Sequence, residues 1–412
     1  MCKKIPAIFL LTFYFSFVSA QNRSLDFFIS NGLQNSPLLK DYAQQLKLNA
    51  LDSSILSASK KPQVNGIGMV MAAPTFHGFG YDAQITNTGN YQAVAAVYQP
   101  LFSKKIFAPQ YEGFRIENQS ANNSGKISAH ELEKDITDQY LTAYSSLNQL
   151  VYNQSLLKLL QDEEPVLKNY VTAGIYRETD YLAFELEKQT QEVAISQLQI
   201  QYRTDLGQLN VLCGISDTGN VQLSPPGINS SMIPFNSVSP FLLQFRIDSL
   251  RLVNQRSLID VRYRAHVSWF ADAGLLTSNP LTLYRNFGFS FGLSVVIPIY
   301  DGHQRGFEYQ KLAVNENIRM NYESFFSMQQ NIHLTQLRMQ MQQLDRLIVQ
   351  EKDLLKTSEV LVDANKQLLD KGQATVTDFI LAIKNNVDIK NQLNQSEISR
   401  FQLLNQFTYW NW

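Results

Sequence analysis

The sequence is almost free of cysteine. Its 412 residues include only Cys2 and Cys213, and Cys2 lies in an N-terminal segment that we expect to be removed during export. A single remaining thiol excludes an intrachain disulfide and leaves no pair of thiols for a metal ion. An exported chain without such bridges must be stabilised by packing or by assembly.

Residues 1–20 have the features of a secretory signal peptide. Lys3-Lys4 forms a basic start, residues 7–18 are mostly apolar, and Val18-Ser19-Ala20 offers small residues for cleavage. The alternative is an uncleaved anchor, but the apolar run is shorter than the ~20 residues that a spanning helix needs. We therefore expect a cleaved signal peptide and a mature chain that begins at Gln21.

Charged side chains are also scarce. They make up 17% of the sequence, against ~25% in an ordinary globular domain. The basic residues are scattered singly, which is unlike the clustered pattern of a nucleic-acid-binding surface. Beyond the signal peptide, the sequence contains no apolar run that is long enough for a transmembrane helix. If the exported chain enters a membrane, it must therefore do so with β-strands.

Sequence patterns of catalysis are missing too. The five histidines fall in no metal-ligand spacing, and no glycine-rich phosphate loop follows a predicted strand. Asp301-Gly302-His303 lies where a strand gives way to a helix, so we predict a turn there rather than a catalytic pair. The acidic run at 162–164 is predicted to be a solvated helix face. We expect no enzyme activity, no cofactor and no metal site.

The sequence does contain a duplication. An offset of 198 residues aligns Pro100 with Pro298 and Gly174 with Gly372, and the order of features is the same in both halves. A repeat this long exceeds the unit of a solenoid. We predict three parts in the mature chain: a first structural repeat at 21–213, a linker or equatorial segment at 214–238, and a second structural repeat at 239–412.

Each repeat contains two predicted strands. In the segment FGFSFGLSVVIPIY, the odd positions from Phe287 to Ile297 are large and apolar, whereas positions 288, 290, 292 and 294 are Gly or Ser. Such alternation puts every apolar side chain on one face of a strand. That face could meet lipid or a soluble core. The predicted strands lie within about 63–102 and 266–300, with polar loops at 77–90 and 278–286.

Four strands are too few to close a barrel. Closure takes roughly eight strands, and at eight the interior is filled by side chains. Two chains would give such a filled barrel, while three would give twelve strands and room for water. The strand count therefore favours a homo-oligomer, and a conduit requires at least three copies.

Long helices are predicted after both strand pairs. Pro100 and Pro298 mark the strand-to-helix junctions, because proline cannot donate to a strand ladder. The segments 107–170 and 303–369 are rich in helix-forming residues, and each would be ~100 Å long. The other predicted helices are two return helices and two segments before the strands, at about 180–212, 378–408, 36–62 and 239–264.

The long helices are predicted to end at Gly174 and Gly372, because glycine suits the left-handed position after a helix C-terminus. Thr179-Asp180 and Thr377-Asp378 then begin the return helices, and Thr375 lies at capping-box spacing from Asp378. Each repeat therefore ends in a tight helical hairpin.

These features resemble the TolC-like outer-membrane efflux protein family. The resemblance covers nearly the whole mature chain and rests on three features: the duplicated helix–strand–strand–helix–helix order, the steps Pro100-Leu101-Phe102 and Pro298-Ile299-Tyr300, and the motif G-x-x-x-x-T-D at Gly174 and Gly372. It implies a mainly α fold with a small β part, in which a trimer forms a twelve-stranded outer-membrane barrel continued by an α-helical periplasmic tunnel.

The resemblance also implies a function and partners. It implies an exit duct that meets a periplasmic adaptor and an inner-membrane pump or secretion ATPase. Asp180 and Asp378 would line the periplasmic aperture, where Arg177 could help to hold the tip shut, although both carboxylates could serve only as helix caps. The hairpin-tip and adaptor contacts would be Gly174, Thr179, Gly372 and Thr377.

Two other classes of protein stay open. An exported coiled-coil scaffold or adhesin would explain the long helices but not the Phe-rich strand. A closed porin for small solutes would explain the strands but not helices of this length.

Overall fold

Most of the chain is helical. The computed structural model describes residues 22–72, 89–101, 103–217, 219, 221–227 and 239–412. Helices, a short 3-10 helix included, account for 75% of the described residues, and a four-stranded antiparallel sheet is the main β part. The predicted mainly α fold class is confirmed. The predicted signal peptide and residues 77–88 of the first predicted loop lie outside the described residues.

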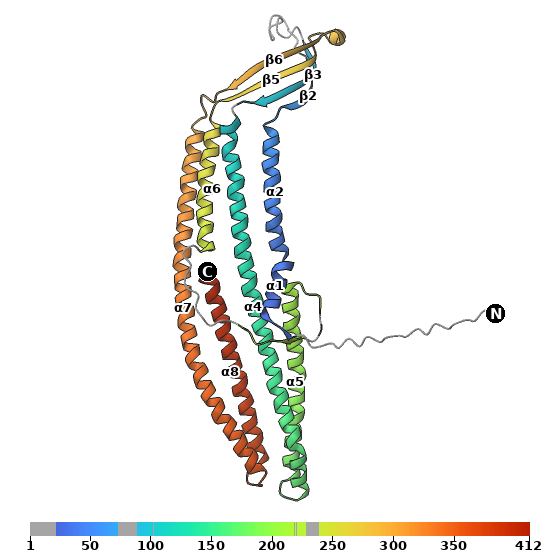
Figure 1. Cartoon of the computed structure of the whole chain (residues 1–412), viewed down its shortest axis with the longest axis vertical. Helices are drawn as coiled ribbons and strands as arrows, with labels where there is room; N and C mark the ends of the chain where they lie inside the picture. The colour runs from blue at the N-terminus through green and yellow to red at the C-terminus, as the bar shows by residue number, and fades with distance from the viewer. Residues whose placement is uncertain (1–21, 73–88, 102, 218, 220, 228–238) are drawn as a thin grey trace, which may run out of the picture. The chain divides into compact units, whose positions relative to one another are not determined.

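The chain divides into two compact units. Both units include part of α4 (Ser103–Thr172) and part of α7 (Gln304–Leu369). The first unit, within residues 1–36, 131–233 and 335–410, also contains α1 (Leu25–Asn35), α5 (Glu178–Cys213) and α8 (Val376–Trp410). The second unit, within residues 37–130, 234–334 and 411–412, contains the sheet, α2 (Pro37–Ser59) and α6 (Pro240–Arg262). Figure 1 labels these elements.

The sheet in the second unit has the order β2-β3-β5-β6 (Figure 1). Its strands are β2 (Gln63–Ala72), β3 (Gly89–Pro100), β5 (His266–Thr277) and β6 (Phe287–Val296). They are 10 to 12 residues long, close to the ~9–11 residues of a tilted transmembrane strand. A short 3-10 helix, Pro280–Arg285, occupies the predicted loop between β5 and β6.

One face of the sheet is mostly apolar on all four strands, with Gln99 and Thr277 at strand ends as its polar members. Phe287, Phe289 and Phe291 on β6 are 74–80% exposed in the single chain. Residues directly opposite one another in paired strands share a face. The register therefore adds alternate residues of the other strands to this face, from Val267 to Leu275, from Tyr91 to Val97 and from Val64 to Val70. The predicted one-sided alternation of this strand is confirmed, and it extends across all four strands.

The opposite face of the sheet is mixed. Apolar side chains such as Val94 and Phe270 share it with polar ones, which include Asn65, Gln92, His266, Asp272, Ser290 and Ser294. The sheet therefore has one mostly apolar face and one face that carries both apolar and polar side chains.

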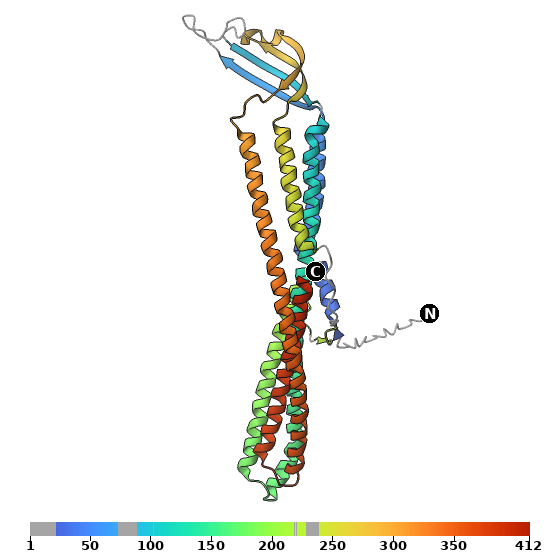
Figure 2. The same ribbon diagram turned by 90° about the vertical axis from the view of Figure 1, so that its left-hand side faces the viewer.

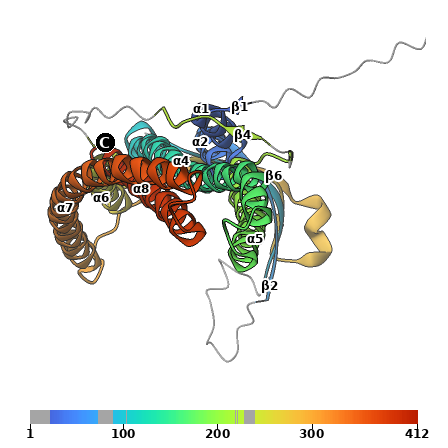
Figure 3. The same cartoon turned by 90° about the horizontal axis from the view of Figure 1, so that it is seen from below.

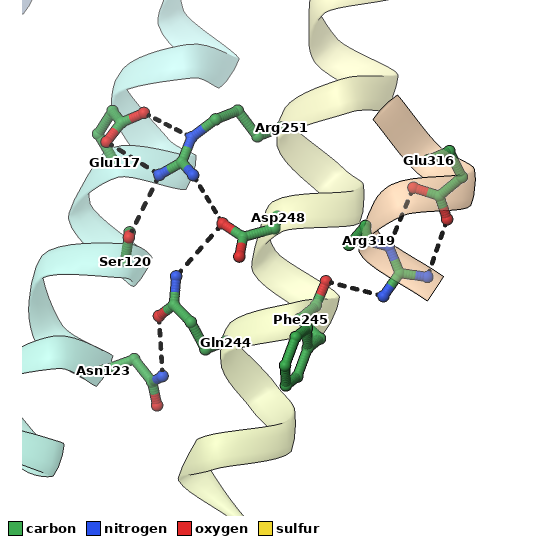
Figure 4. A network of polar contacts seen from close by, with 9 residues as sticks. All are labelled: Glu117, Ser120, Asn123, Gln244, Phe245, Asp248, Arg251, Glu316 and Arg319. Carbon is green, nitrogen blue, oxygen red and sulfur yellow. Dashed lines mark hydrogen bonds and ion pairs between the residues drawn. The ribbon is translucent and has the colours of Figure 1, made fainter. Parts of the chain in front are cut away.

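Within the second unit, a polar network joins the helices beside the sheet (Figure 4). The guanidinium of Arg251 on α6 donates to Glu117 on α4 at 3.0 Å and to Asp248 at 2.6 Å. On α7, Arg319 donates to the carboxylate of Glu316 and, at 3.4 Å, to the Phe245 carbonyl of α6. Each arginine therefore links two helices while its charge is balanced by carboxylates.

The first unit has a core that the sequence did not predict. Phe28 on α1 is fully buried beside Tyr140, and the Tyr140 hydroxyl lies 2.5 Å from the Ser224 carbonyl. Nearby, β1 (Asn22–Arg23) pairs in parallel with β4 (Gln222–Leu223), which lies in the predicted equatorial segment.

No helix in the described part of the chain is long and apolar enough to cross a membrane.

Candidate functional site: the paired hairpin tips

Both long helices end with the same backbone motif. Gly174 and Gly372 follow α4 and α7 with φ of +73° and +69°, in the left-handed region. In each tip the glycine N–H bonds to the carbonyl three residues earlier, at 3.0 and 2.9 Å. The next N–H bonds to the carbonyl five residues earlier, at 2.9 and 2.8 Å. This is the Schellman pattern, which satisfies carbonyls left unpaired at a helix end. The helix ends predicted at these glycines are confirmed.

The two aspartates of the tips bond to the first turns of the return helices. Asp180 Oδ2 accepts the N–H of Arg177 at 3.0 Å. In α8, Asp378 Oδ2 accepts the Thr375 hydroxyl at 2.6 Å, and the Asp378 N–H donates to that hydroxyl oxygen at 3.1 Å. These contacts confirm the predicted capping box at Thr375 and give both carboxylates a capping role. Arg177 meets Asp180 through its main-chain amide.

The other predicted tip residues lie at the surface. Thr179 and Thr377 are the second residues of α5 and α8, and both are exposed. The two tip loops touch, since a Cβ atom added at Gly372 would lie 3.2 Å from Ile175 Cγ2. The structure therefore brings the two tips of one chain together and leaves both threonines accessible.

Two tyrosines of the first tip hold the backbone of the second. The Tyr176 hydroxyl lies 2.9 Å from the Leu369 carbonyl oxygen and 3.0 Å from that of Ala374. Because a hydroxyl has one proton, the two carbonyls share it. The Tyr170 hydroxyl donates to the Asp370 carbonyl at 2.7 Å, and the two tyrosine rings pack edge to face at 6.0 Å. We call Tyr170 and Tyr176 the tyrosine latch.

An apolar cluster lies under the latch. Phe184 from α5 and Phe379 from α8 are both 0% exposed, and they share one cluster with residues of α4 and α7. Figures 2 and 3 show these four helices. Tyr176 packs against the same cluster, and this burial raises the pKa of its hydroxyl above the ordinary value. The latch thus links the packed base of the first tip to the backbone of the second tip through neutral hydrogen bonds.

Ion pairs join the two hairpins as well. Lys366 on α7 lies 2.6 Å from Glu163 on α4, whose side chain is only 6% exposed. The prediction that the acidic run at 162–164 is solvated is therefore wrong for Glu163. Its carboxylate faces α7 because Lys366 there supplies a basic partner. Hydrogen bonding to Glu163 raises the pKa of Lys366. A second pair, between Lys384 and Glu187, measures 3.3 Å.

The strand-to-helix junctions belong to the second unit. Pro100 is the last residue of β3 and lies opposite Ser268. β6 ends at Val296, earlier than the predicted limit of 300, so Pro298 follows the strand instead of closing it. Proline lacks the N–H that would extend the ladder. Asp301 forms the predicted turn, since its carboxylate accepts main-chain N–H groups of residues 303 and 305, both at 2.9 Å.

Sequence reasoning missed the tyrosine latch. Its acceptors are main-chain carbonyls about two hundred residues away, and carbonyls carry no sequence signature. One signal was present: Tyr176 aligns with Ala374 between the repeats, so an aromatic residue occurs in one tip loop only.

Among the described residues, no group of three His, Cys, Asp or Glu side chains could hold a metal ion.

The fold matches solved structures of membrane proteins over nearly its whole length. A membrane protein from Pseudomonas aeruginosa aligns with a TM-score of 0.74 at 13% identity, over 94% of this chain and 90% of that one. The outer membrane protein VceC from Vibrio cholerae aligns with a TM-score of 0.73 at 12% identity, over 94% and 95%. The CmeC outer membrane channel from Campylobacter jejuni gives 0.69 at 10% identity, over 94% and 85%.

At identities this low, the likeness establishes the fold. The chain therefore has the fold of outer-membrane channel proteins, as its TolC-like resemblance implied. No protein-family model and no curated protein matches the sequence.

Proposed function

We propose that this protein is the outer-membrane exit duct of a trans-envelope export system. It would act as a passive, gated channel for small molecules or for proteins of a type I-like secretion route. The observation that carries the proposal is the amphipathic sheet, which has an exposed apolar face and two unpaired edge strands, β2 and β6. The fold shared with outer-membrane channels supports it.

The edge strands support a homotrimer. An exposed apolar edge strand such as β6 favours pairing with another chain, and a membrane-spanning sheet must close because lipid offers no hydrogen bonds. Three chains with four strands each would close a twelve-stranded barrel with a water-filled interior. The Phe-rich face would meet outer-membrane lipid, and the mixed face would line the interior.

The hairpin tips would form the periplasmic aperture. Asp180 and Asp378 would then contribute six carboxylates around the tunnel end, and a carboxylate ring favours cations. The tyrosine latch would hold the two hairpins of each chain together in the closed state. The exposed tip positions Thr179 and Thr377, turned outward by Gly174 and Gly372, would contact a periplasmic adaptor that connects the duct to an inner-membrane pump or secretion ATPase.

Conductance in planar lipid bilayers tests the proposal. Purified protein should insert and give discrete current steps, and its mass in detergent should be about three times that of the mature chain. A mutation that opens the tip should raise the current. A monodisperse monomer that gives no current steps would refute the duct.

The alternative is an exported coiled-coil scaffold or adhesin without a pore. The long helices α4 and α7 favour it, but it gives no reason for phenylalanines that are 74–80% exposed on one strand. A trimer that binds lipid but never conducts would favour the scaffold.

A further inference from the structure

Asp272 is unusual among the strand residues. The four strands of the sheet contain 10, 12, 12 and 10 residues, and Asp272 is the one Asp, Glu, Lys or Arg among them. An ionisable side chain at membrane depth is costly and is therefore a candidate for function. A folded barrel could keep the charge of Asp272 only where water reaches it.

The register places Asp272 on the mixed face. Directly across from it lie Ala96 on β3 and Ser290 on β6, and Asn65 on β2 continues the same row. Its neighbours along β5, Ala271 and Ala273, point to the apolar face with Phe291 and Phe289. The carboxylate is therefore on the side of the sheet away from the exposed phenylalanines.

The side chain of Asp272 has a neutral hydrogen-bond partner. Its Oδ2 accepts the Ser290 hydroxyl at 2.6 Å, and a hydroxyl is a neutral donor. Two other described titratable side chains lie on this face of the strands. Tyr98 on β3 is opposite Phe270, and His266 is six residues away from Asp272 along β5, or about 20 Å. On this face of β6, Gly288 beside Ser290 has open space above it, whereas the Phe270 ring covers Gly292 on the other side.

We propose that Asp272 is a charge filter of the duct, separate from the tips. One carboxylate per chain would face the water-filled interior of the barrel and favour cationic over anionic solutes. This inference rests on the proposed function, because it needs a closed and conducting barrel. Asp272 differs from the tip carboxylates, which accept the Arg177 amide and the Thr375 hydroxyl just before α5 and α8.

Cysteine substitution in the assembled protein tests whether residue 272 faces water, and labelling of that cysteine restores a charge there. Asp272→Cys should react with a water-soluble, sulfonate-bearing methanethiosulfonate, since it would face the aqueous interior. The matched controls Ala271→Cys and Ala273→Cys should not react, because they lie on the opposite face. The native Cys213 is 0% exposed, so labelling reports on the introduced thiol.

Reversal potentials under a KCl gradient measure how the charge at residue 272 affects ion selectivity. At about 0.1 M salt, where screening extends ~10 Å, Asp272→Asn and unlabelled Asp272→Cys should each lower the K⁺/Cl⁻ permeability ratio about twofold. Near 1 M salt, where screening falls to ~3 Å, the difference should shrink. Asp272→Glu and the sulfonate-labelled cysteine should both keep the ratio of the unmodified channel, whereas an uncharged methyl label should not.

The outcomes separate this inference from the function on which it rests. A conducting channel whose ratio is unchanged in Asp272→Asn, or an Asp272→Cys that stays unlabelled while Ala271→Cys reacts, overturns the filter and leaves the duct intact. Ser290→Ala should retain the ratio. If Ser290→Ala and Asp272→Asn lower heat stability equally and leave selectivity alone, Asp272 is only a cross-strand contact. Wild-type protein that never conducts refutes the duct itself.

Discussion

The two hairpin tips have the same backbone but different side-chain chemistry. Both end a long helix at a left-handed glycine and begin a return helix with an aspartate bonded to its first turn. The first tip, however, supplies the hydroxyls of Tyr170 and Tyr176, and the second supplies only main-chain carbonyls to receive them. Duplication has thus kept the turn geometry, while divergence of the side chains allows one copy to hold the other.

The largest effect is expected from the glycines. Valine in the left-handed region costs ~1–2 kcal/mol, so Gly174→Val and Gly372→Val should both lower thermal stability. Gly372→Val should be worse, because its Cβ would lie 3.2 Å from Ile175 while Gly174 has no atom within 4 Å. Melting curves give the comparison.

Export assays test whether this strain matters for function. Both glycine variants should assemble trimers normally yet export less, because the damaged tips would dock poorly. Normal export by both would count against tip docking, and equal melting temperatures would remove the asymmetry between the tips.

The tyrosine latch should give the next largest effect. Tyr176→Phe removes a shared hydrogen bond with a net value of ~0.5–1.5 kcal/mol, and it keeps the ring. Open probability in planar bilayers should therefore rise by severalfold, with a smaller rise for Tyr170→Phe. Tyr181→Phe is the matched control, since its hydroxyl bonds at 3.3 Å to Glu164 within the first hairpin. Equal behaviour of Tyr176→Phe and Tyr181→Phe would argue against the latch.

The tips show what could be predicted from the sequence. Gly174, Gly372 and the Thr375–Asp378 box follow local rules of helix ends, so their geometry could be inferred from residue type and spacing. The alternation from Phe287 onward likewise fixed one face of β6. The latch could not be predicted, because it depends on how two distant hairpins pack. The β1–β4 pair was missed for a similar reason: two residues per strand carry no periodic pattern.

The latch should respond to alkali. Burial raises the pKa of Tyr176 in the folded tip, so the neutral hydroxyl is favoured by folding. Its contribution should be fully present below the ordinary tyrosine value of ~10 and be lost as pH rises through the raised folded value. Open probability should stay flat from about pH 6 to 9 and increase above about pH 10. A latch that opens already near neutrality would contradict this account.

The smallest effect is expected from the aspartates. Asparagine keeps a capping oxygen but loses the favourable charge at a helix N-terminus, worth ~0.3–1 kcal/mol. The double variant with Asp180→Asn and Asp378→Asn should therefore melt within a few degrees of wild type. If the carboxylates also ring the aperture, its cation selectivity should fall. Unchanged single-channel currents would leave both residues as helix caps.

The most direct test of the exit duct is particle imaging of the detergent-solubilised protein. The account predicts a threefold assembly, with a short barrel of twelve strands, four from each chain, in the detergent belt. The helical hairpins should converge at the opposite end, with Tyr176 of each chain against the neighbouring hairpin of the same chain. Single chains, or assemblies in which the sheet edges β2 and β6 remain unpaired, would contradict it.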